Sequence, residues 1–378
     1  MPELVHLHCH SQYSLLDGAC DIAGMMEKIK KDGQPGIALT DHGNMFGAFN
    51  FVNEANKRGL KAIVGCEFYM VADRHKQAFS KVKGEKDERY HQLLLAKNQS
   101  GYQNLSKLCS LGYIEGSYGK YPRIDKELIL KYHEGLIATS CCVGAEIPQA
   151  ILQGKLEEAE RLVKWWKDLF GDDFYIELQD HGIENLDDSG LSQHDLNKIL
   201  IGFAKKFDIK TIATNDVHYL EEDDWEPHDI LLCVNTNSKL LEPERFKFPK
   251  KNFYLKTQQE MNALFAHVPQ ALDNTIEVLS KIETPKLKRD IILPNFPIPV
   301  EYKSQDEYLR ALVFEGAKRC YGELNAIVIE RIEFELKVIT EMKFSGYFLI
   351  VQDFIKAARK IGVRVGPGRG SAAGSVVA

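Results

Sequence analysis

The sequence predicts an α/β protein in which a barrel of alternating strands and helices is followed by a mostly helical segment. Strand and helix patterns alternate about seven times over some 220 residues, which favours parallel strands joined by right-handed crossovers. Side chains able to bind metal fall mostly where the expected strands end, and βα barrels build their active sites at that edge. We therefore expect a distorted βα barrel of about seven strands with a metal site at one edge.

The composition is that of a globular protein with a full core. The chain has 378 residues, of which 44% are hydrophobic and 27% charged, so roughly two or three domains are expected. Its net charge of −6 means that a nucleic-acid partner would have to be held by a local basic patch or by metal ions. There is no signal peptide, no long apolar run and no Cys-x-x-Cys pair. We therefore expect a cytoplasmic protein that does not act on a membrane and has no disulfide framework.

A strong metal-site pattern lies in the first stretch, residues 6–18. If this stretch begins as a strand, side chains alternate between its faces, and His6, His8 and His10 project to the same side. Asp17 lies in the loop that follows. Imidazole and carboxylate ligands together suit zinc, manganese or iron rather than magnesium alone. Surface histidines or a purification tag are the alternative, but apolar residues interrupt this run.

The remaining elements are read from apolar periodicity and from helix ends. The first helix is expected to begin after the N-cap Asp21 and to end at Gly33, and the second is closed by Gly59. Residues 72–90 are polar and rich in lysine, so we expect an exposed excursion there. The expected strands are residues 5–9, 36–39, 62–64, 93–96, 136–138, 174–178 and 211–213. The expected helices of this part are residues 22–31, 46–58, 102–109, 146–152, 155–170 and 191–207.

Candidate metal ligands follow or border these strands. His42 ends the second strand, and Glu67 falls just beyond the third. His91 opens the fourth apolar run. The remaining candidates come after the fifth and the last strand: Cys142, Asp216 and His218. Ordinary core histidines and loop carboxylates would account for two or three such positions, but not for so many at one edge.

The composition changes from about residue 259, and four prolines fall within residues 284–300. Prolines at this density indicate a linker and the boundary of a domain. We expect a barrel domain at 1–283, a linker at 284–302 and a further domain that begins at 303–378. Helices are expected at 304–319, 326–342 and 347–360.

A glycine-rich stretch, residues 366–374, lies near the end of the chain. Its glycines let a ligand approach the backbone closely, and Arg364 and Arg369 add positive charge. Residues 371–378 look like the first turns of a helix, whose amides can hold phosphate, so a nucleoside triphosphate is the expected ligand. The spacing fits neither the P-loop nor the dinucleotide fingerprint well, and a purely structural turn is the alternative. The sequence that follows is short, so we expect the chain to be a fragment.

Together these motifs resemble the bacterial replicative (C-family) DNA polymerase III alpha subunits. The resemblance spans the whole chain and covers the N-terminal polymerase-and-histidinol-phosphatase (PHP) domain and the start of the polymerase palm. It implies a distorted TIM-like βα barrel followed by a mostly helical segment that leads into the palm. The matching motifs are His8-x-His10, Ser14-Leu15-Leu16-Asp17-Gly18, Thr40-Asp41-His42, Gly65-Cys66-Glu67, His91 with Leu93 to Asn98, Cys142-Val143-Gly144-Ala145-Glu146-Ile147-Pro148, Asn215-Asp216-Val217-His218-Tyr219 and Gly366-Pro367-Gly368-Arg369-Gly370-Ser371 with Gly374-Ser375.

The resemblance also implies site residues. Cys142 is favoured over Cys141 as a ligand, Asp41 is expected to orient an imidazole, and His6 and His181 are not family ligands. The implied metal ligands, for up to three zinc or manganese ions, are His8, His10, Asp17, His42, Glu67, His91, Cys142, Asp216 and His218. The implied catalytic residues among them are Asp17, His42, Asp216 and His218. The implied contacts to an incoming triphosphate are Arg369, Gly370, Ser371 and Ser375.

For the whole protein the resemblance implies DNA synthesis with magnesium on a primer-template, from deoxynucleoside triphosphates. Implied partners are other replicase subunits, namely the sliding clamp and a proofreading exonuclease subunit. The polymerase aspartates are expected beyond residue 378, so this chain is not expected to polymerise DNA.

Three interpretations of the PHP domain remain. It hydrolyses DNA phosphodiesters as a 3′–5′ exonuclease, or it is a catalytically silent module that metals staple together and that docks a separate proofreading subunit. A free-standing phosphatase of the histidinol-phosphate type is disfavoured by the palm-like tail and by the length.

Overall fold

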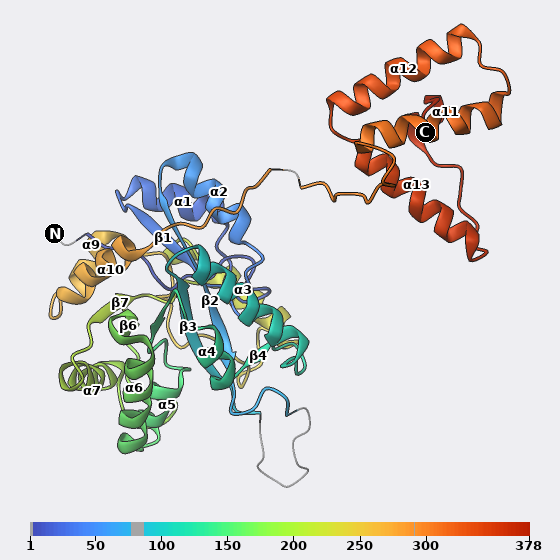
Figure 1. Cartoon of the computed structure of the whole chain (residues 1–378). Coiled ribbons are helices and arrows are strands. Elements are labelled where there is room, and N and C mark those ends of the chain that lie inside the picture. The colour runs from blue at the N-terminus through green and yellow to red at the C-terminus, as the bar shows by residue number, and fades with distance from the viewer. Residues whose placement is uncertain (1–2, 77–86, 291) are drawn as a thin grey trace. The chain divides into compact units, whose positions relative to one another are not determined.

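The computed structural model describes residues 3–76, 87–290 and 292–378. The chain divides into two compact units, Met1–Lys288 and Arg289–Ala378. The first unit contains the sheet, and the second is helical (Figure 1). Among the described residues, no helix has the length and apolarity that a membrane span requires.

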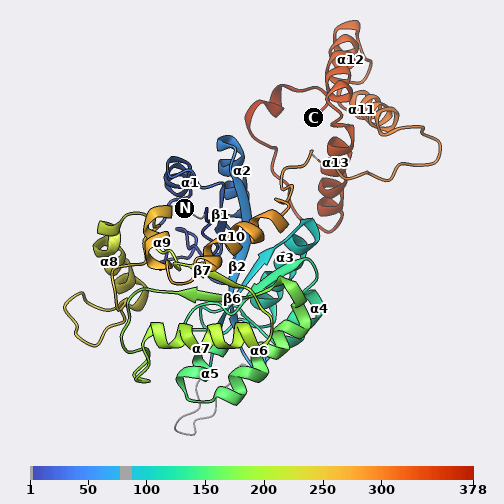
Figure 2. The same cartoon turned by 90° about the vertical axis from the view of Figure 1, so that its left-hand side faces the viewer.

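The first unit is built on one seven-stranded sheet with helices packed around it, as two perpendicular views show (Figures 1 and 2). The strands follow each other in the order β1-β2-β3-β5-β6-β7, and the short β4 pairs with β2. The strands are β1 (Gly36–Leu39), β2 (Lys61–Met70), β3 (Tyr90–Ala96), β4 (Arg123–Ile124), β5 (Leu136–Thr139), β6 (Phe174–Gln179) and β7 (Thr211–Thr214).

The N-terminal segment closes this sheet into a barrel. His6 bridges Ile37 of β1 in parallel, and Cys9 bridges Val217, which follows β7. The amide of His10 donates to the carbonyl of Val217 at 2.7 Å, so the two edges of the sheet share one segment. The segment makes only isolated bridges instead of the regular strand expected at 5–9. It therefore takes the place of a seventh strand, irregular in form, in a distorted barrel.

The expectation of an all-parallel sheet is wrong at β3. This strand pairs antiparallel with both β2 and β5, while the other neighbours on the main path are parallel. A parallel pair needs a long crossover, usually a helix, and the sequence between β2 and β3 has no helical pattern. Because β3 runs backwards, its first residues lie at the edge where the other strands end. This places His91 among the residues that follow the other strands.

The interior of the barrel has an apolar half and a polar half. Alternate strand residues form an inner cluster that helix α10 (Gln270–Lys281) joins through Val278 and Leu279. Toward the carboxyl ends of the strands, the same inward positions are polar, with Thr139 on β5 and Glu177 on β6. The apolar members from the N-terminal segment and the strands are Val5, Leu7, Ala38, Ile63, Leu93, Leu95, Ile137, Tyr175 and Ile212.

Helices cover the outside of the barrel, and five of those among the described residues, α1, α3, α4, α7 and α9, begin at a side-chain cap. Asp21 accepts a hydrogen bond from the amide of Gly24, and Ser192 with Asp195 forms a capping box. Trp166 is fully buried against the sheet. The helices are α1 (Ile22–Lys31), α2 (Ala48–Arg58), α3 (Gln99–Ile114), α4 (Lys126–Tyr132), α5 (Glu146–Leu152), α6 (Leu156–Phe170), α7 (Gln193–Lys206), α8 (Trp225–Thr236) and α9 (Gln258–Leu264), with the 3₁₀ turns η1 (Gly171–Asp173) and η2 (Glu222–Asp224).

Part of the excursion expected at 72–90, residues 77–86, lies outside the described residues. The described ends are anchored to the barrel. Arg74 is buried and pairs with Asp125 at 2.9 Å and with Glu115 at 2.7 Å. The expectation of an exposed segment is therefore wrong at Arg74, because its guanidinium is held by carboxylates.

The second unit packs three helices around a small core. They are α11 (Gln305–Tyr321), α12 (Ala326–Glu341) and α13 (Ser345–Lys360). Leu309, Ile332 and Leu349 lie at the centre of this core. The glycine-rich stretch that follows contains one 3₁₀ turn, η3 (Gly370–Gly374).

Candidate metal centre

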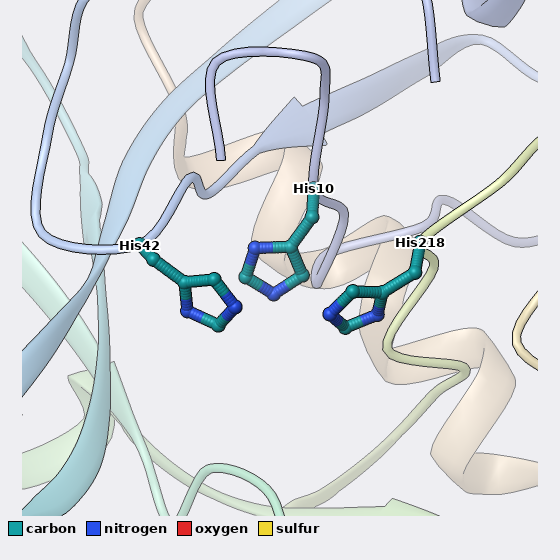
Figure 3. A group of neighbouring side chains, drawn as sticks. All are labelled: His10, His42 and His218. Carbon is teal, nitrogen blue, oxygen red and sulfur yellow. The ribbon is translucent and has the colours of Figure 1, made fainter. Parts of the chain in front are cut away.

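The carboxyl edge of the barrel carries three overlapping groups of possible metal ligands. One contains His8, His10, Glu67 and Asp216, the second His10, His42 and His218, and the third Glu67 with the two adjacent cysteines. Within each group the ligand atoms lie within 4.8 Å of one another. Figure 3 shows the second group, in which the ring of His10 lies between the other two, at centroid distances of 4.0 and 4.4 Å.

Glu67 lies at the centre of these groups. It sits on β2 with 1% of its surface exposed. Its Oε2 atom is 3.0 Å from His10 Nε2 and 3.0 Å from His42 Nδ1. Its Oε1 atom is 2.5 Å from His91 Nδ1. The two oxygens of one carboxylate thus face different imidazoles, which is the arrangement of a bridging ligand.

Two aspartates approach the same histidines from loops. Asp17 Oδ2 lies 2.6 Å from His42 Nε2 and 3.5 Å from His218 Nε2. Asp216 Oδ1 lies 3.3 Å from both His8 Nε2 and His10 Nε2. Asp216 has a φ of 45°, a left-handed backbone that aspartate tolerates better than most residues. Strained residues of this kind cluster at functional sites.

The loop that carries Asp17 is fixed by a close backbone approach. A Cβ atom on Gly18 would lie 2.2 Å from the carbonyl oxygen of Ser11, so no other residue fits there. His228 of α8 holds the loop from the other side, with its Nε2 atom 2.7 Å from the Asp17 carbonyl oxygen. Asp17 therefore approaches His42 on a rigid support.

Both adjacent cysteines reach the centre. Cys142 Sγ lies 3.5 Å from Glu67 Oε1 and 3.4 Å from His91 Nδ1, and Cys141 Sγ lies 3.6 Å from the same Glu67 atom. A hydrogen bond from Cys141, together with His91, lowers the pKa of the Cys142 thiol. Burial raises the pKa of Cys141 well above its usual value. The thiolate is the metal-binding form, so the environment favours Cys142 as a ligand.

The buried charges of the centre depend on each other. Burial opposes ionisation of Glu67, but His91, His42 and His8 hold the pKa of its carboxyl well below the usual value. Burial likewise opposes protonation of His42, yet Glu67 and Asp17 raise its pKa well above the usual value. Burial, with His42 and His218 nearby, lowers the pKa of His10. Buried carboxylates at this density need positive charge beside them, from imidazolium groups or from metal ions.

Several polar atoms of the centre have close ion-pair contacts but no hydrogen bond of good geometry. Among the described residues, they include His10 Nε2, His42 Nδ1 and Asp216 Oδ1, all of which are buried and face the cluster. A buried polar atom without a well-formed hydrogen bond is costly, so three in one place point to a ligand between them. Imidazole nitrogens and carboxylate oxygens suit zinc or manganese, and the thiolate favours zinc at its own position. The residues present therefore fit a metal cluster.

A second layer of buried groups orients the histidines. His8 Nδ1 lies 2.7 Å from Glu177 Oε1. His10 Nδ1 lies 3.0 Å from Ser14 Oγ, which donates to Asp41 Oδ1 at 2.7 Å. Asp41 therefore acts on an imidazole through Ser14. Such carboxylate–histidine contacts fix which imidazole nitrogen is free to bind metal.

Glu177 and Ser14 were not assigned a role from the sequence. The signal for Glu177 was a single carboxylate inside the apolar run 174–178, since a buried acid in a strand needs partners. His6 and His181 are both buried, and neither belongs to the three groups of possible ligands. His6 Nε2 contacts the Lys256 carbonyl oxygen at 2.8 Å, so the expectation that His6 shares a face with His8 and His10 is wrong.

Two cavities open onto the centre. One of about 460 Å³ is lined by Asp17, His42, Asp216 and His218, and the other of about 630 Å³ by Asp17 and His42. His8, His10 and Glu67 line neither cavity. A substrate therefore reaches the centre from the side of the two aspartates.

The residues expected to contact a triphosphate lie in the second unit. Arg369, Gly370 and Ser371 are exposed at η3, and Ser375 Oγ donates to Glu335 Oε2 at 2.7 Å. The expectation of helical turns over 371–378 is wrong, because the chain leaves η3 after one turn. The amides of the two residues after Ser375 donate to the same Glu335 oxygen, at 3.0 Å each, which holds this end in a non-helical form.

Comparisons with known proteins agree with this architecture. Residues 6–181 match the profile of the PHP domain family, and residues 307–378 match a profile described as the bacterial DNA polymerase III alpha NTPase domain. The DNA polymerase III subunit alpha of Borreliella burgdorferi is 45% identical over 379 residues, which cover 99% of this chain and 32% of that protein. The corresponding protein of Treponema pallidum is 42% identical over 375 residues, which cover 99% of this chain and 31% of that protein.

The chain thus spans about a third of the length of the curated relatives it matches. A solved amidohydrolase structure from Chromobacterium violaceum aligns with 60% of this chain and 96% of its own at 15% identity, with a TM-score of 0.36, too low to support an argument. Both domain profiles occur in one chain, and two relatives exceed 40% identity over 99% of it. The chain therefore belongs to the family of bacterial DNA polymerase III alpha subunits, with a PHP domain near its N-terminus.

Proposed function

We propose that the PHP domain hydrolyses DNA phosphodiesters with a multinuclear metal site and acts as a 3′–5′ proofreading exonuclease on the primer end. The observation that supports this most is the convergence of nine buried or half-buried candidate ligands on one edge of the barrel, where buried polar atoms face each other without well-formed hydrogen bonds. We also propose that the whole protein carries out DNA synthesis from deoxynucleoside triphosphates with magnesium, together with clamp and proofreading subunits.

We assign the ions to zinc or manganese, held by the nine residues named from the sequence. Bound divalent cations stabilise the charge of a phosphodiester and lower the pKa of water from about 15.7 to about 7. Glu67, His8 and His10 are the innermost ligands because they line neither cavity. Asp17, His42, Asp216 and His218 line the cavity of about 460 Å³, and we assign them to the reacting phosphate and water.

The test combines metal content with hydrolysis of a labelled primer by the purified chain, with and without a chelator. We expect bound metal and chelator-sensitive release of nucleotides from the 3′ end. His10→Ala and Asp216→Ala should each lower the metal content and abolish hydrolysis. The control is His194→Ala, since His194 is exposed on α7. Unchanged metal content and rate in both ligand variants would refute the assignment.

One observation favours a second function, that of a metal-stapled structural module. His8 and His10 lie on the segment that closes the barrel, and Asp216 and His218 follow β7 on the far side of the same seam. Ions held here would join the two edges of the sheet. This alternative is supported if bound metal raises the free energy of unfolding and the protein hydrolyses no DNA.

A further inference from the structure

Exposed aromatic side chains line the larger cavity at the metal centre. Phe46 and Tyr113 lie on one wall, with ring centroids 6.2 Å apart. Phe246, from the segment between α8 and α9, lines both cavities. These three side chains are 60%, 43% and 56% exposed. A single exposed aromatic needs no explanation, but three that line one cavity indicate a binding surface.

The segment that carries Phe246 is also strongly basic. Residues 245–251 contain four basic residues and two phenylalanines, in a chain with a net charge of −6. Lys247 is exposed, lines the smaller cavity and forms no ion pair among the residues that the structure describes. Phe248, one residue further, packs its ring against His218 at a centroid distance of 4.8 Å. Of the four basic residues, Lys247 lines the cavity at the metal centre, whereas Arg245 pairs with Asp229.

We propose that Phe46, Tyr113 and Phe246 form a stacking surface for the unpaired bases at a DNA end, and that Lys247 contacts a phosphate next to the one being cleaved. This inference rests on the proposed phosphodiesterase function and specifies its substrate as a single-stranded end. Aromatic faces take up bases only when the bases have left the duplex stack. Lysine beside them neutralises the backbone without reading sequence.

The size of the cavity supports an unpaired end over a duplex. Its volume of about 630 Å³ falls in the range of about 300 to 1,000 Å³ that encloses a small ligand. A double helix is far wider than such a cavity, and its bases are already stacked on each other. A terminal mismatch frees bases for this surface at a lower cost than a paired end does.

The proposal is tested by the binding of a labelled oligothymidylate to the full 378-residue chain, measured by fluorescence anisotropy. A chelator is present, so the measurement does not depend on hydrolysis. Phe46→Ala and Phe246→Ala should each weaken binding by about 5- to 100-fold. Phe49→Ala is the matched control, because Phe49 is 53% exposed on α2 but lines neither cavity. Tyr113→Phe should bind like the wild type, and Tyr113→Ala should bind more weakly.

An oligonucleotide with abasic 3′-terminal positions separates stacking from charge. The wild-type protein should bind this abasic oligonucleotide more weakly than oligothymidylate. Phe46→Ala should not weaken binding of the abasic oligonucleotide further. Lys247→Ala should reduce the salt dependence of the binding constant by about one phosphate contact for both oligonucleotides. Lys239→Ala is the control, because Lys239 is exposed on the same segment, and it should leave the salt dependence unchanged. Wild-type affinity in Phe46→Ala and Phe246→Ala, or tighter binding of blunt duplex than of single strand, would overturn the proposal.

Hydrolysis of the oligonucleotide with abasic 3′-terminal positions, whose end has no ring to stack, distinguishes this inference from the proposed function. Phe46→Ala should leave that rate unchanged while it raises the KM for the oligothymidylate. Equal losses on both substrates would show that the ring supports the metal centre and would refute base stacking. If the wild type hydrolyses neither substrate, the proposed function fails, and the anisotropy series still decides whether the surface binds single strands.

Discussion

Glu177→Gln should weaken metal binding although Glu177 is not among the nine proposed ligands. Its carboxylate is 1% exposed and has four donors around it. His8 Nδ1 lies at 2.7 Å, Thr139 Oγ1 and Thr214 Oγ1 donate at 2.6 Å each, and Gln179 Nε2 donates at 3.0 Å. A glutamine keeps the shape but replaces one acceptor oxygen with an NH₂ group, so at least one donor loses its partner.

The magnitude follows from the contact between His8 and Glu177. A buried hydrogen bond to a charged group contributes about 1.5 to 3 kcal/mol, which is roughly a 10- to 150-fold change in an equilibrium constant. Measured losses for groups that orient metal-binding histidines are about 10- to 100-fold. The two estimates overlap, so we expect a loss of about 10- to 100-fold in affinity for the first ion bound by His8.

The assay is competition with a chromophoric chelator for zinc and for manganese, on protein stripped of metal, with circular dichroism to verify the fold. Glu226→Gln, an exposed change of the same kind on α8, serves as the control. An affinity within twofold of the wild type in correctly folded Glu177→Gln would show that His8 needs no such partner and would refute the reasoning.

Three further predictions concern other parts of the chain. Limited proteolysis should cut between residues 289 and 302, where the described residues, 289–290 and 292–302, form no helix or strand, and a first cut within 130–220 would contradict a single barrel. The 378-residue chain should bind nucleoside triphosphates no more tightly than the millimolar range, about −4 kcal/mol, in calorimetry with magnesium; micromolar binding would mean that the triphosphate site was misassigned. Burial lowers the pKa of His181 to about 4, below about 6.5 in the unfolded chain. The unfolded state therefore binds the proton first, and the free energy of unfolding should fall as the pH decreases from about 6.5 to 4, by up to roughly 3 kcal/mol from this group. In urea titrations, the free energy of unfolding of His181→Gln should depend less on pH than that of the wild type. His194→Gln should show the same pH dependence as the wild type.

The sequence allowed the class of the fold and most of its helices to be predicted, because those helices combine apolar periodicity with clear caps. Asp21 and Gly59 mark two such ends. The direction of β3 was missed because periodicity shows that a strand exists but not which way it runs. The helices α4 and α8 were missed as well. The hydrophobicity of α8 is distributed nearly evenly around its axis, and α4 is only seven residues long.

The predicted ligands do come together, since strand ends on one edge of a barrel are neighbours whatever the details of the loops. The roles of these nine residues remain proposals. Local sequence could not separate Cys141 from Cys142, because their difference depends on contacts with His91 and Glu67 from distant strands. The role of Ser14 was hidden for the same reason, as its partners His10 and Asp41 meet it only in the folded chain.

The closing seam of the barrel determines when the protein can finish folding. The amide of Val5 bonds to Thr275 across 270 residues of sequence, and His6 reaches the Lys256 carbonyl across 250. Contacts between such distant residues carry the largest loop-closure entropy, so they are expected to form last. During synthesis the first residues can therefore make these contacts only after most of the barrel has emerged from the ribosome. Bound metal would then stabilise the final step of folding. Amide exchange at His10 and Val217 should be the first to accelerate when metal is withdrawn.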